Sequence, residues 1–212
     1  MRRTTWPNTL AGVCAAGLLL VASIGCGNLA EKIKTAANSQ ASTANTSPSP
    51  AGTKKSADGQ KLYESAGQLD EFTKALAAAV GTDNPNVLKI ALYDSYGMIE
   101  VQDPSKPENI DGYSWRDGKL SPPNPVKIIG GGKITDNVFP LREVNIAGLP
   151  DLTKEIAEKL KDVEGGTMIG YTISRGLPFS KEVHILGLTN STRKSVSTEA
   201  DKNAKLKKFE VR

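Results

Sequence analysis

Residues 87–103, VLKIALYDSYGMIEVQD, carry the pattern that decides the fold. Two runs of aliphatic, β-branched and aromatic residues flank Asp94 and Ser95, which is typical of two antiparallel strands joined by a tight turn. Before this hairpin, apolar residues recur three and four positions apart over residues 62–80, and Gly81 follows as a stop signal. This spacing predicts an amphipathic helix, so the chain begins its folded part as a helix followed by a hairpin.

A second hairpin is predicted from NIDGYSWR and KLSPPNPVKII, which are joined by Asp117 and Gly118. This dipeptide is a strong two-residue turn signal. Three prolines stand at positions 122, 123 and 125. Because proline cannot donate a hydrogen bond to a neighbouring strand, they move the last strand to a sheet edge or delay its start.

The same order of elements is predicted again further along the chain. Apolar residues from Leu149 to Leu160 mark a second helix, which Gly165-Gly166 follows. TMIGYTISR alternates and is predicted to place Ile169, Tyr171 and Ile173 on one face. EVHILGLTN, KSVST and KLKKFEV complete a second set of strands.

We therefore expect an α+β fold made of two tandem helix-plus-antiparallel-sheet units, which could share one sheet. The units are residues 59–135 and 136–212. A loose alignment of one unit with the other pairs Ile99 with Ile173 and Pro104 with Pro178. The alternative is a single α+β domain without internal symmetry.

The start of the chain carries an export pattern. Arg2 and Arg3 precede an uncharged, largely apolar stretch over residues 10–25, and Cys26 follows it directly. The stretch is short for a membrane span. It resembles the lipobox signals of bacterial lipoproteins, in which the signal is cut before the cysteine and the thiol receives a diacylglycerol. The alternatives are an ordinary signal peptide and an uncleaved anchor.

The resemblance implies a signal peptide over residues 1–25 and a lipid anchor on Cys26, with acyl chains such as palmitate. Residues 26–58 are predicted to be a flexible, disordered linker, because Ser, Thr, Ala, Asn and Pro cannot bury enough apolar surface to fold. The expected location is the extracytoplasmic face of the cell membrane.

Composition excludes several kinds of chemistry. The chain has one histidine, His184, and two cysteines, one of which lies in the signal, so we expect no cofactor and no multi-histidine or thiolate metal site. IGGGKIT at 129–135 lacks the spacing of a phosphate-binding loop. The formal net charge of +4 is mild and does not predict nucleic-acid binding. We expect a protein that is not an enzyme, and His184 as a structural residue.

The candidate binding surface consists of aromatic residues and one arginine, types that are enriched in binding hot spots: Tyr93, Tyr96, Tyr113, Trp115 and Arg116. Core packing is the competing interpretation for Tyr113 and Trp115. The C-terminal stretch from Lys202 to Arg212 is basic, which fits either contact with anionic lipid or protection of an edge strand by lysine.

The motif D-P-x-x-P-E-N-x-D-x-Y-x-W-R-D-G, at residues 103–118, resembles uncharacterised lipoproteins and secreted proteins of actinobacteria. The predicted topology also looks like PepSY-type modules, which bind other proteins without catalysis. The resemblance implies a membrane-anchored, non-catalytic binding or scaffold module of the cell envelope. Its partner would be an unknown envelope protein or lipid. The alternative is a carrier of a lipid or glycolipid.

Overall fold

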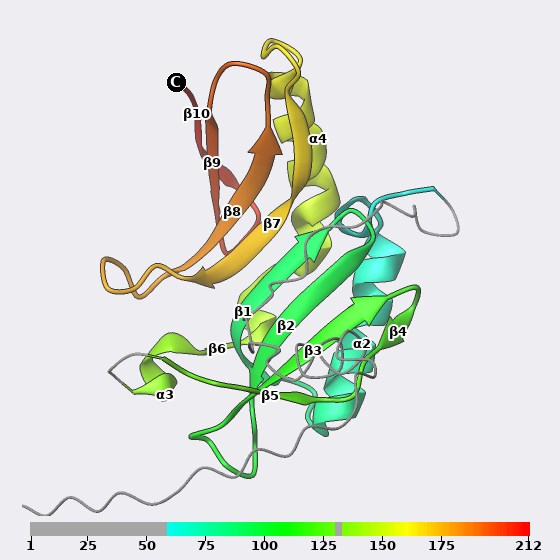
Figure 1. Ribbon diagram of the computed structural model, residues 1–212, viewed down its shortest axis with the longest axis vertical. Coiled ribbons are helices and arrows are strands. Elements are labelled where there is room, and N and C mark those ends of the chain that lie inside the picture. The colour runs from blue at the N-terminus through cyan, green and yellow to red at the C-terminus, as the bar shows by residue number, and fades with distance from the viewer. Residues whose placement is uncertain (1–58, 130–132) are drawn as a thin grey trace, which may run out of the picture. The chain divides into compact units, whose positions relative to one another are not determined.

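The computed structural model describes residues 59–129 and 133–212. The predicted signal peptide, the Cys26 anchor and the linker lie outside the described residues, as does the middle of the 129–135 glycine motif. The described residues form one antiparallel sheet with its two longer helices on one face (Figure 1). The predicted α+β class is therefore confirmed.

The first half begins with a 3₁₀ turn and a helix and continues with five strands. These elements are η1 (Leu62–Glu64), α2 (Ala66–Val80), β1 (Asn86–Tyr93), β2 (Tyr96–Gln102), β3 (Ile110–Arg116), β4 (Lys119–Leu120) and β5 (Asn124–Val126). Both predicted hairpins are present, since β1 pairs with β2 and β3 with β4.

The second half again places a helix before a run of strands. Its elements are α3 (Ile134–Asn137), β6 (Phe139–Pro140), η2 (Leu141–Glu143), η3 (Ile146–Gly148), α4 (Leu149–Leu160), β7 (Thr167–Arg175), β8 (Val183–Asn190), β9 (Val196–Asp201) and β10 (Leu206–Val211). The short strand β6 pairs with β1 of the first half.

The two halves meet at the middle of the sheet. The strand order is β10-β9-β8-β7-β1-β2-β3-β4, with β5 beside β3. β1 and β7 are antiparallel, and Ile90 lies opposite Ile173. Ile99 is on the second strand after α2 and Ile173 on the first strand after α4, so the loose alignment that pairs them does not match strands in equivalent positions. A true tandem repeat stays a prediction.

The first helix begins later than its apolar spacing suggests. Leu62 belongs to the 3₁₀ turn, and Ser65 caps α2 by accepting a hydrogen bond from the Gln68 backbone N–H. This cap satisfies one of the free donors of the first helical turn. The buried side chains of α2 are Leu69, Phe72 and Leu76, as the spacing predicted.

One predicted strand face is wrong at its first residue. Tyr171 and Ile173 are fully buried, but Ile169 is 42% exposed. A bulge between Met168 and Gly170 shifts the register of β7 against β8. Because a shift of one residue moves side chains to the other face of a strand, Met168 is buried in place of Ile169.

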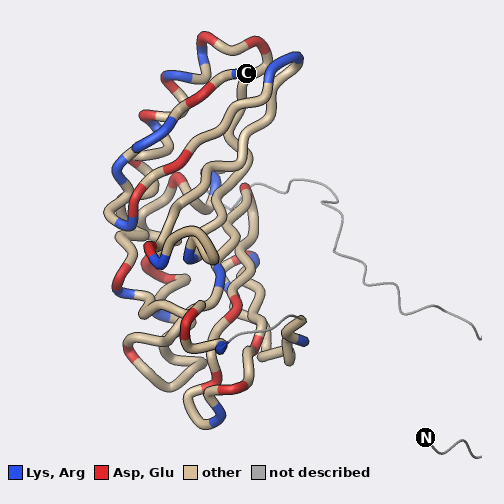
Figure 2. The backbone as a smooth tube through the Cα atoms, turned by 90° about the vertical axis from the view of Figure 1, so that its left-hand side faces the viewer, with Lys and Arg blue, Asp and Glu red and all other residues tan. Residues whose placement is uncertain are grey.

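All described elements belong to one compact unit, Pro50–Arg212. Its core lies between the sheet and the helices and includes Tyr63, Phe72, Leu149 and Tyr171, each fully buried. The described part of the chain holds no helix that is long and apolar enough to cross a membrane. Figure 2 shows basic and acidic residues interspersed along the folded backbone rather than separated into two regions.

Candidate functional site

Tyr93, Tyr96 and Arg116 form one stacked row across three strands. Tyr93 is the last residue of β1, and Tyr96 is the first residue of β2 after the Asp94-Ser95 turn. Arg116 of β3 lies opposite Tyr96. The two tyrosine rings are 4.7 Å apart between centroids and 20° from parallel. The Arg116 guanidinium carbon lies 4.9 Å from the centre of the Tyr96 ring, within the range of a cation–π contact.

This row projects from the face of the sheet opposite the helices. The alternate positions Leu92, Gly97 and Trp115 face the core. Tyr93 and Tyr96 are half-buried, and Arg116 is exposed. Burial, and then the neighbouring Tyr93, raise the pKa of the Tyr96 hydroxyl. The row therefore places aromatic surface, phenolic hydroxyls and one positive charge on the open face of the sheet.

The turn that carries the two tyrosines is held from behind by η1. The Leu62 backbone N–H donates to the Asp94 carbonyl at 2.8 Å. The Tyr63 hydroxyl lies 2.6 Å from the Asp94 carboxylate and 3.0 Å from the Met168 carbonyl. Lys61 Nζ lies 3.0 Å from the same carbonyl and 3.6 Å from Asp94. We call this set, Lys61, Tyr63 and Asp94, the turn clasp.

Tyr63 is the buried member of the clasp, while the side chains of Lys61 and Asp94 are 31% and 30% exposed. Tyr63 is fully buried and packs edge-on against Tyr171, and burial together with the Asp94 carboxylate raises the pKa of Tyr63 far above its ordinary value. A buried phenol with a charged acceptor makes a stronger hydrogen bond than a neutral pair. The clasp therefore fixes the Asp94-Ser95 turn and, with it, the positions of Tyr93 and Tyr96.

Tyr113 and Trp115 do not belong to this surface, which corrects that part of the predicted site. They are only 7% and 4% exposed. Trp115 packs edge-on against Phe72 of α2, with ring centroids 5.9 Å apart. The alternation of β3 directs both side chains to the helix-covered face and Arg116 to the open face.

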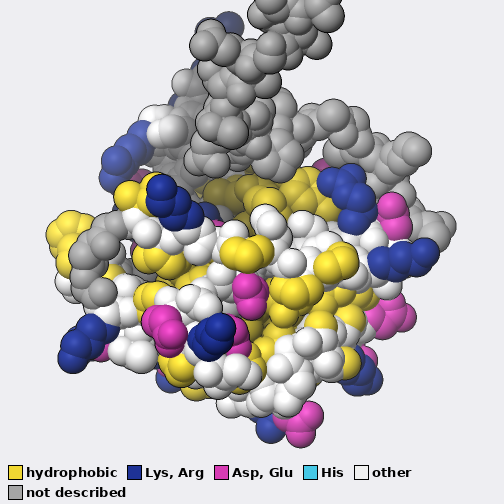
Figure 3. All heavy atoms as spheres, turned by 60° about the horizontal axis from the view of Figure 1, so that its bottom comes forward, with side chains coloured by type: hydrophobic (Ala, Val, Ile, Leu, Met, Phe, Trp, Pro, Cys, Tyr) yellow, Lys and Arg dark blue, Asp and Glu magenta, His cyan; other side chains and the backbone are white. Residues whose placement is uncertain are grey.

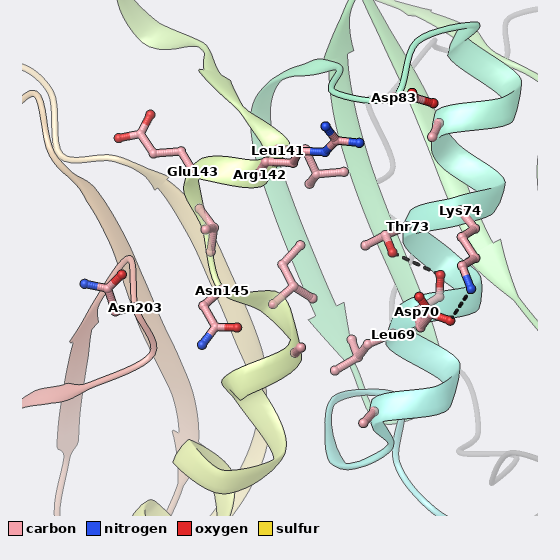
Figure 4. Close-up of a pocket in the computed structure, with 15 residues that line it drawn as sticks. Leu69, Asp70, Thr73, Lys74, Asp83, Leu141, Arg142, Glu143, Asn145 and Asn203 are labelled. Carbon is pink, nitrogen blue, oxygen red and sulfur yellow. Dashed lines mark hydrogen bonds and ion pairs between the residues drawn. The ribbon is translucent and has the colours of Figure 1, made fainter.

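A surface groove of about 590 Å³ lies between α2 and the segment Leu141–Ala147. Figure 4 shows side chains from both walls turned toward it. Its floor is apolar and comes from Leu69, Leu141 and Ile146, which are themselves buried. The groove was not predicted, because its two walls come from different halves of the chain.

The rim of the groove is polar and of mixed charge. Lys74 lies 2.7 Å from Asp70 on α2, and on the other wall Glu143 lies 3.5 Å from Arg175 and 3.6 Å from Lys202. The residues that line the groove include no histidine or cysteine. This arrangement can hydrogen-bond a polar ligand through side chains on both walls.

His184 lies on the open face of β8 and contacts Glu199 of β9 through Nδ1. Its Nε2 is buried and has no hydrogen-bond partner among the described residues. Gly176 packs against the imidazole ring of His184, since a Cβ at position 176 would lie 2.9 Å from Nε2. One ring nitrogen of His184 is therefore paired and the other has no partner among the described residues, and the structural role of His184 stays a prediction.

The described residues include no group of three or more His, Cys, Asp or Glu that could hold a metal ion.

Three of the largest exposed hydrophobic side chains are on connections between elements: Ile129, 86% exposed, Ile128, 43%, and Phe179, 96%. Figure 3 brings the end with β5 and α3 forward and shows hydrophobic side chains spread over its middle, broken by a few charged ones.

Comparison with known proteins identifies no family for this chain. No family profile and no curated protein matches it. One solved structure is similar, that of a predicted lipoprotein, CD1622, from Clostridium difficile 630. The two chains are 11% identical, and the match covers 72% of this chain and 99% of the other with a TM-score of 0.48.

Sequence reasoning named Tyr93, Tyr96 and Arg116 as candidates but did not predict what positions them. The Tyr63–Asp94 contact joins residues 31 apart, and the Tyr63–Met168 contact joins residues 105 apart. An acidic residue in a two-residue turn is a usable signal, because its carboxylate can accept from a neighbouring element. The sequence offered no such signal for Met168, which contributes only its backbone carbonyl.

Proposed function

We propose that this protein is a lipid-anchored lipoprotein of the cell envelope, held at the membrane by Cys26, whose folded part is a non-catalytic binding module. The observation that carries the binding role is the stacked row Tyr93–Tyr96–Arg116 on the uncovered face of the sheet. The expected partner is an envelope protein. Tyrosine and arginine are the residue types that dominate protein–protein hot spots.

Two features of the row support this role. The clasp holds the turn before any partner arrives, so binding would cost little conformational entropy. In addition, Tyr96 covers one side of the Tyr93 ring, while the cross-strand neighbour on the other side is Gly170, which has no side chain. A planar side chain of the partner could therefore extend the stack next to Tyr93.

The binding role is tested by photo-crosslinking in living cells. A photoreactive amino acid replaces Tyr96, and in a matched control it replaces Lys161, which directly follows α4 and is likewise at the surface. We expect a discrete crosslinked protein from position 96 only. Arg116→Ala in the same background should reduce its yield more than Arg116→Lys, because lysine keeps the charge. Equal yields from both positions would contradict the proposal.

The anchor is tested separately. Metabolic labelling with a palmitate analogue should mark the wild-type chain and leave Cys26→Ala unlabelled. Since two acyl chains suffice for stable anchoring, the wild type should fractionate with membranes and the variant should not. Labelling of the variant would exclude Cys26 as the attachment point.

The alternative function is transport of a lipid or glycolipid ligand. The groove beside α2 favours it, because about 590 Å³ is within the range of small-molecule sites. Native mass spectrometry of protein extracted gently from its own membrane distinguishes the two functions. A bound mass beyond the acyl groups would favour the carrier, and a bound protein would favour the binding module.

A further inference from the structure

The two outer edges of the sheet differ in how they end. At one edge the strands are short, since β4 has two residues and β5 three, and Pro125 lies within β5. Short strands and proline protect an edge against pairing with another chain. At the other edge, β10 has six residues and no proline; its pairing with β9 is irregular between Leu206 and Lys208 and continuous from Lys208 to Val211. Among the described residues, no strand pairs with its outer side.

The backbone of β10 has free hydrogen-bonding groups on that side. Arg212 and Ser195 exchange both of their backbone hydrogen bonds, at 2.9 and 3.1 Å. Because such pairs alternate along an antiparallel ladder, Glu210 and Lys208 also direct their backbone groups toward β9. Phe209 and Val211 therefore present their N–H and C=O groups to the open edge.

The side chains on the open face of β10 do not repel a second strand, because positive and negative charges alternate along it. Lys208 Nζ lies 2.8 Å from Glu210 Oε2, and the Arg212 guanidinium lies 3.1 Å from the same oxygen. These contacts hold the pKa of Glu210 at about 2, so its charge persists through the physiological range. The open face of β10 thus carries alternating opposite charges, and Phe209 lies between them on the helix side, with Lys159 Nζ 6.0 Å from its ring centre.

We propose that two copies of this chain associate through antiparallel pairing of their β10 strands around a two-fold axis at Phe209. In this register, Lys208 of each copy lies opposite Glu210 of the other, and the two Phe209 side chains are cross-strand neighbours. Opposite charges and aromatic pairs at facing positions stabilise antiparallel strands. The outward backbone groups of the two Phe209 residues meet, as the hydrogen-bonding pattern requires.

The neighbouring registers place like charges together. An axis at Lys208 would bring two lysines face to face. An axis at Glu210 would bring two glutamates face to face and Lys208 opposite Arg212. An axis between residues would pair outward backbone groups with inward ones. An axis at Val211 would also place Glu210 opposite Arg212, but because β10 ends at Val211 it would leave most of the strand unpaired. Charge order and the length of strand paired together therefore favour the register centred on Phe209, and the inference does not depend on the proposed function.

The test uses the unit Pro50–Arg212, which contains the whole described core. Sedimentation equilibrium should show a concentration-dependent dimer for the wild type. Lys208→Glu and Glu210→Lys should each weaken self-association about tenfold, because each opposes like charges twice across the axis. An equimolar mixture of the two variants should restore the dimer, since every facing pair is again opposite in charge.

A backbone variant keeps the proposal falsifiable if the charge variants misfold. Val211→Pro removes an outward N–H that does not bond to β9, and the Val211 side chain is 38% exposed. The Val211→Pro monomer should therefore fold as the Val211→Ala monomer does, but it should no longer form the dimer. A wild type that stays monomeric at its highest soluble concentration overturns the proposal. A mixture of charge variants that remains monomeric overturns the register. Monomers that bind anionic vesicles through Lys208 would assign the edge to lipid instead.

Discussion

Tyr63→Phe removes a single hydroxyl from the turn clasp and leaves the packing of the ring unchanged. Tyr63 is fully buried, and its hydroxyl donates to the Asp94 carboxylate at 2.6 Å. A hydrogen bond to a charged group contributes about 1.5–3 kcal/mol to stability. Lys61 stays within 3.6 Å of Asp94 and 3.0 Å of the Met168 carbonyl, so the loss should lie near the lower end, about 2 kcal/mol.

Tyr171→Phe is the matched control. Tyr171 is also fully buried and touches Tyr63, but its hydroxyl pairs with the neutral Thr153 hydroxyl at 2.8 Å. Thr153 keeps its bond to the Leu149 carbonyl after the change. The expected loss is therefore smaller, about 1 kcal/mol, as for an ordinary neutral hydrogen bond.

Urea denaturation of Pro50–Arg212 followed by far-ultraviolet circular dichroism measures both variants. At about 2–4 °C per kcal/mol, the Tyr63 variant should also melt about 4–8 °C below the wild type. A double-mutant cycle with Asp94→Asn isolates the pairwise contact and should give positive coupling. If Tyr63→Phe costs no more than Tyr171→Phe, or shows no coupling to Asp94, then the charged hydrogen bond does not hold the turn.

Three further predictions concern stability. Gly170→Ala should destabilise the unit by more than about 2 kcal/mol, because a Cβ there would lie 2.2 Å from the Leu92 carbonyl oxygen; urea midpoints compared with wild type measure it. Gly67→Ala on α2 should instead stabilise by about 0.5–1 kcal/mol, since open space surrounds that position, and a lower midpoint would be inconsistent with a regular first turn. Finally, the raised pKa values of Tyr63 and Tyr171 mean that both stay protonated in the fold after the unfolded chain has lost these protons. Their stabilisation is complete below about pH 10, the ordinary tyrosine value, and is lost as pH rises above it, so alkaline titration of the unfolding free energy should fall less steeply in Tyr63→Phe than in the wild type.

The sequence predicted what depends on near neighbours in the chain. Apolar spacing found both helices, and the Asp117-Gly118 turn forms as expected, with positive φ angles of 51° and 73°. The two-residue spacing around Asp94-Ser95 also brings Tyr93 and Tyr96 together. Such features follow from local backbone geometry, which a few consecutive residues specify.

The exposure of the candidate residues was predicted only in part, because a strand pattern does not say which face of the sheet will be covered. Alternation shows that Tyr113 and Trp115 share a side, but only the packing of α2 decides that this side is buried. The bulge that exposes Ile169 depends in the same way on how β7 pairs with β8.

Tertiary structure alone decided how the two halves join and what holds the candidate site. The pairing of β1 with β7, the groove beside α2 and the clasp at Asp94 each bring together residues from distant parts of the chain. Contacts of this kind depend on the closure of long loops, whose cost is repaid by burial of the whole core rather than by any local signal. The sequence by itself therefore determined the elements and the row of candidate residues, and the packed core determined which of those residues lie on the open face of the sheet.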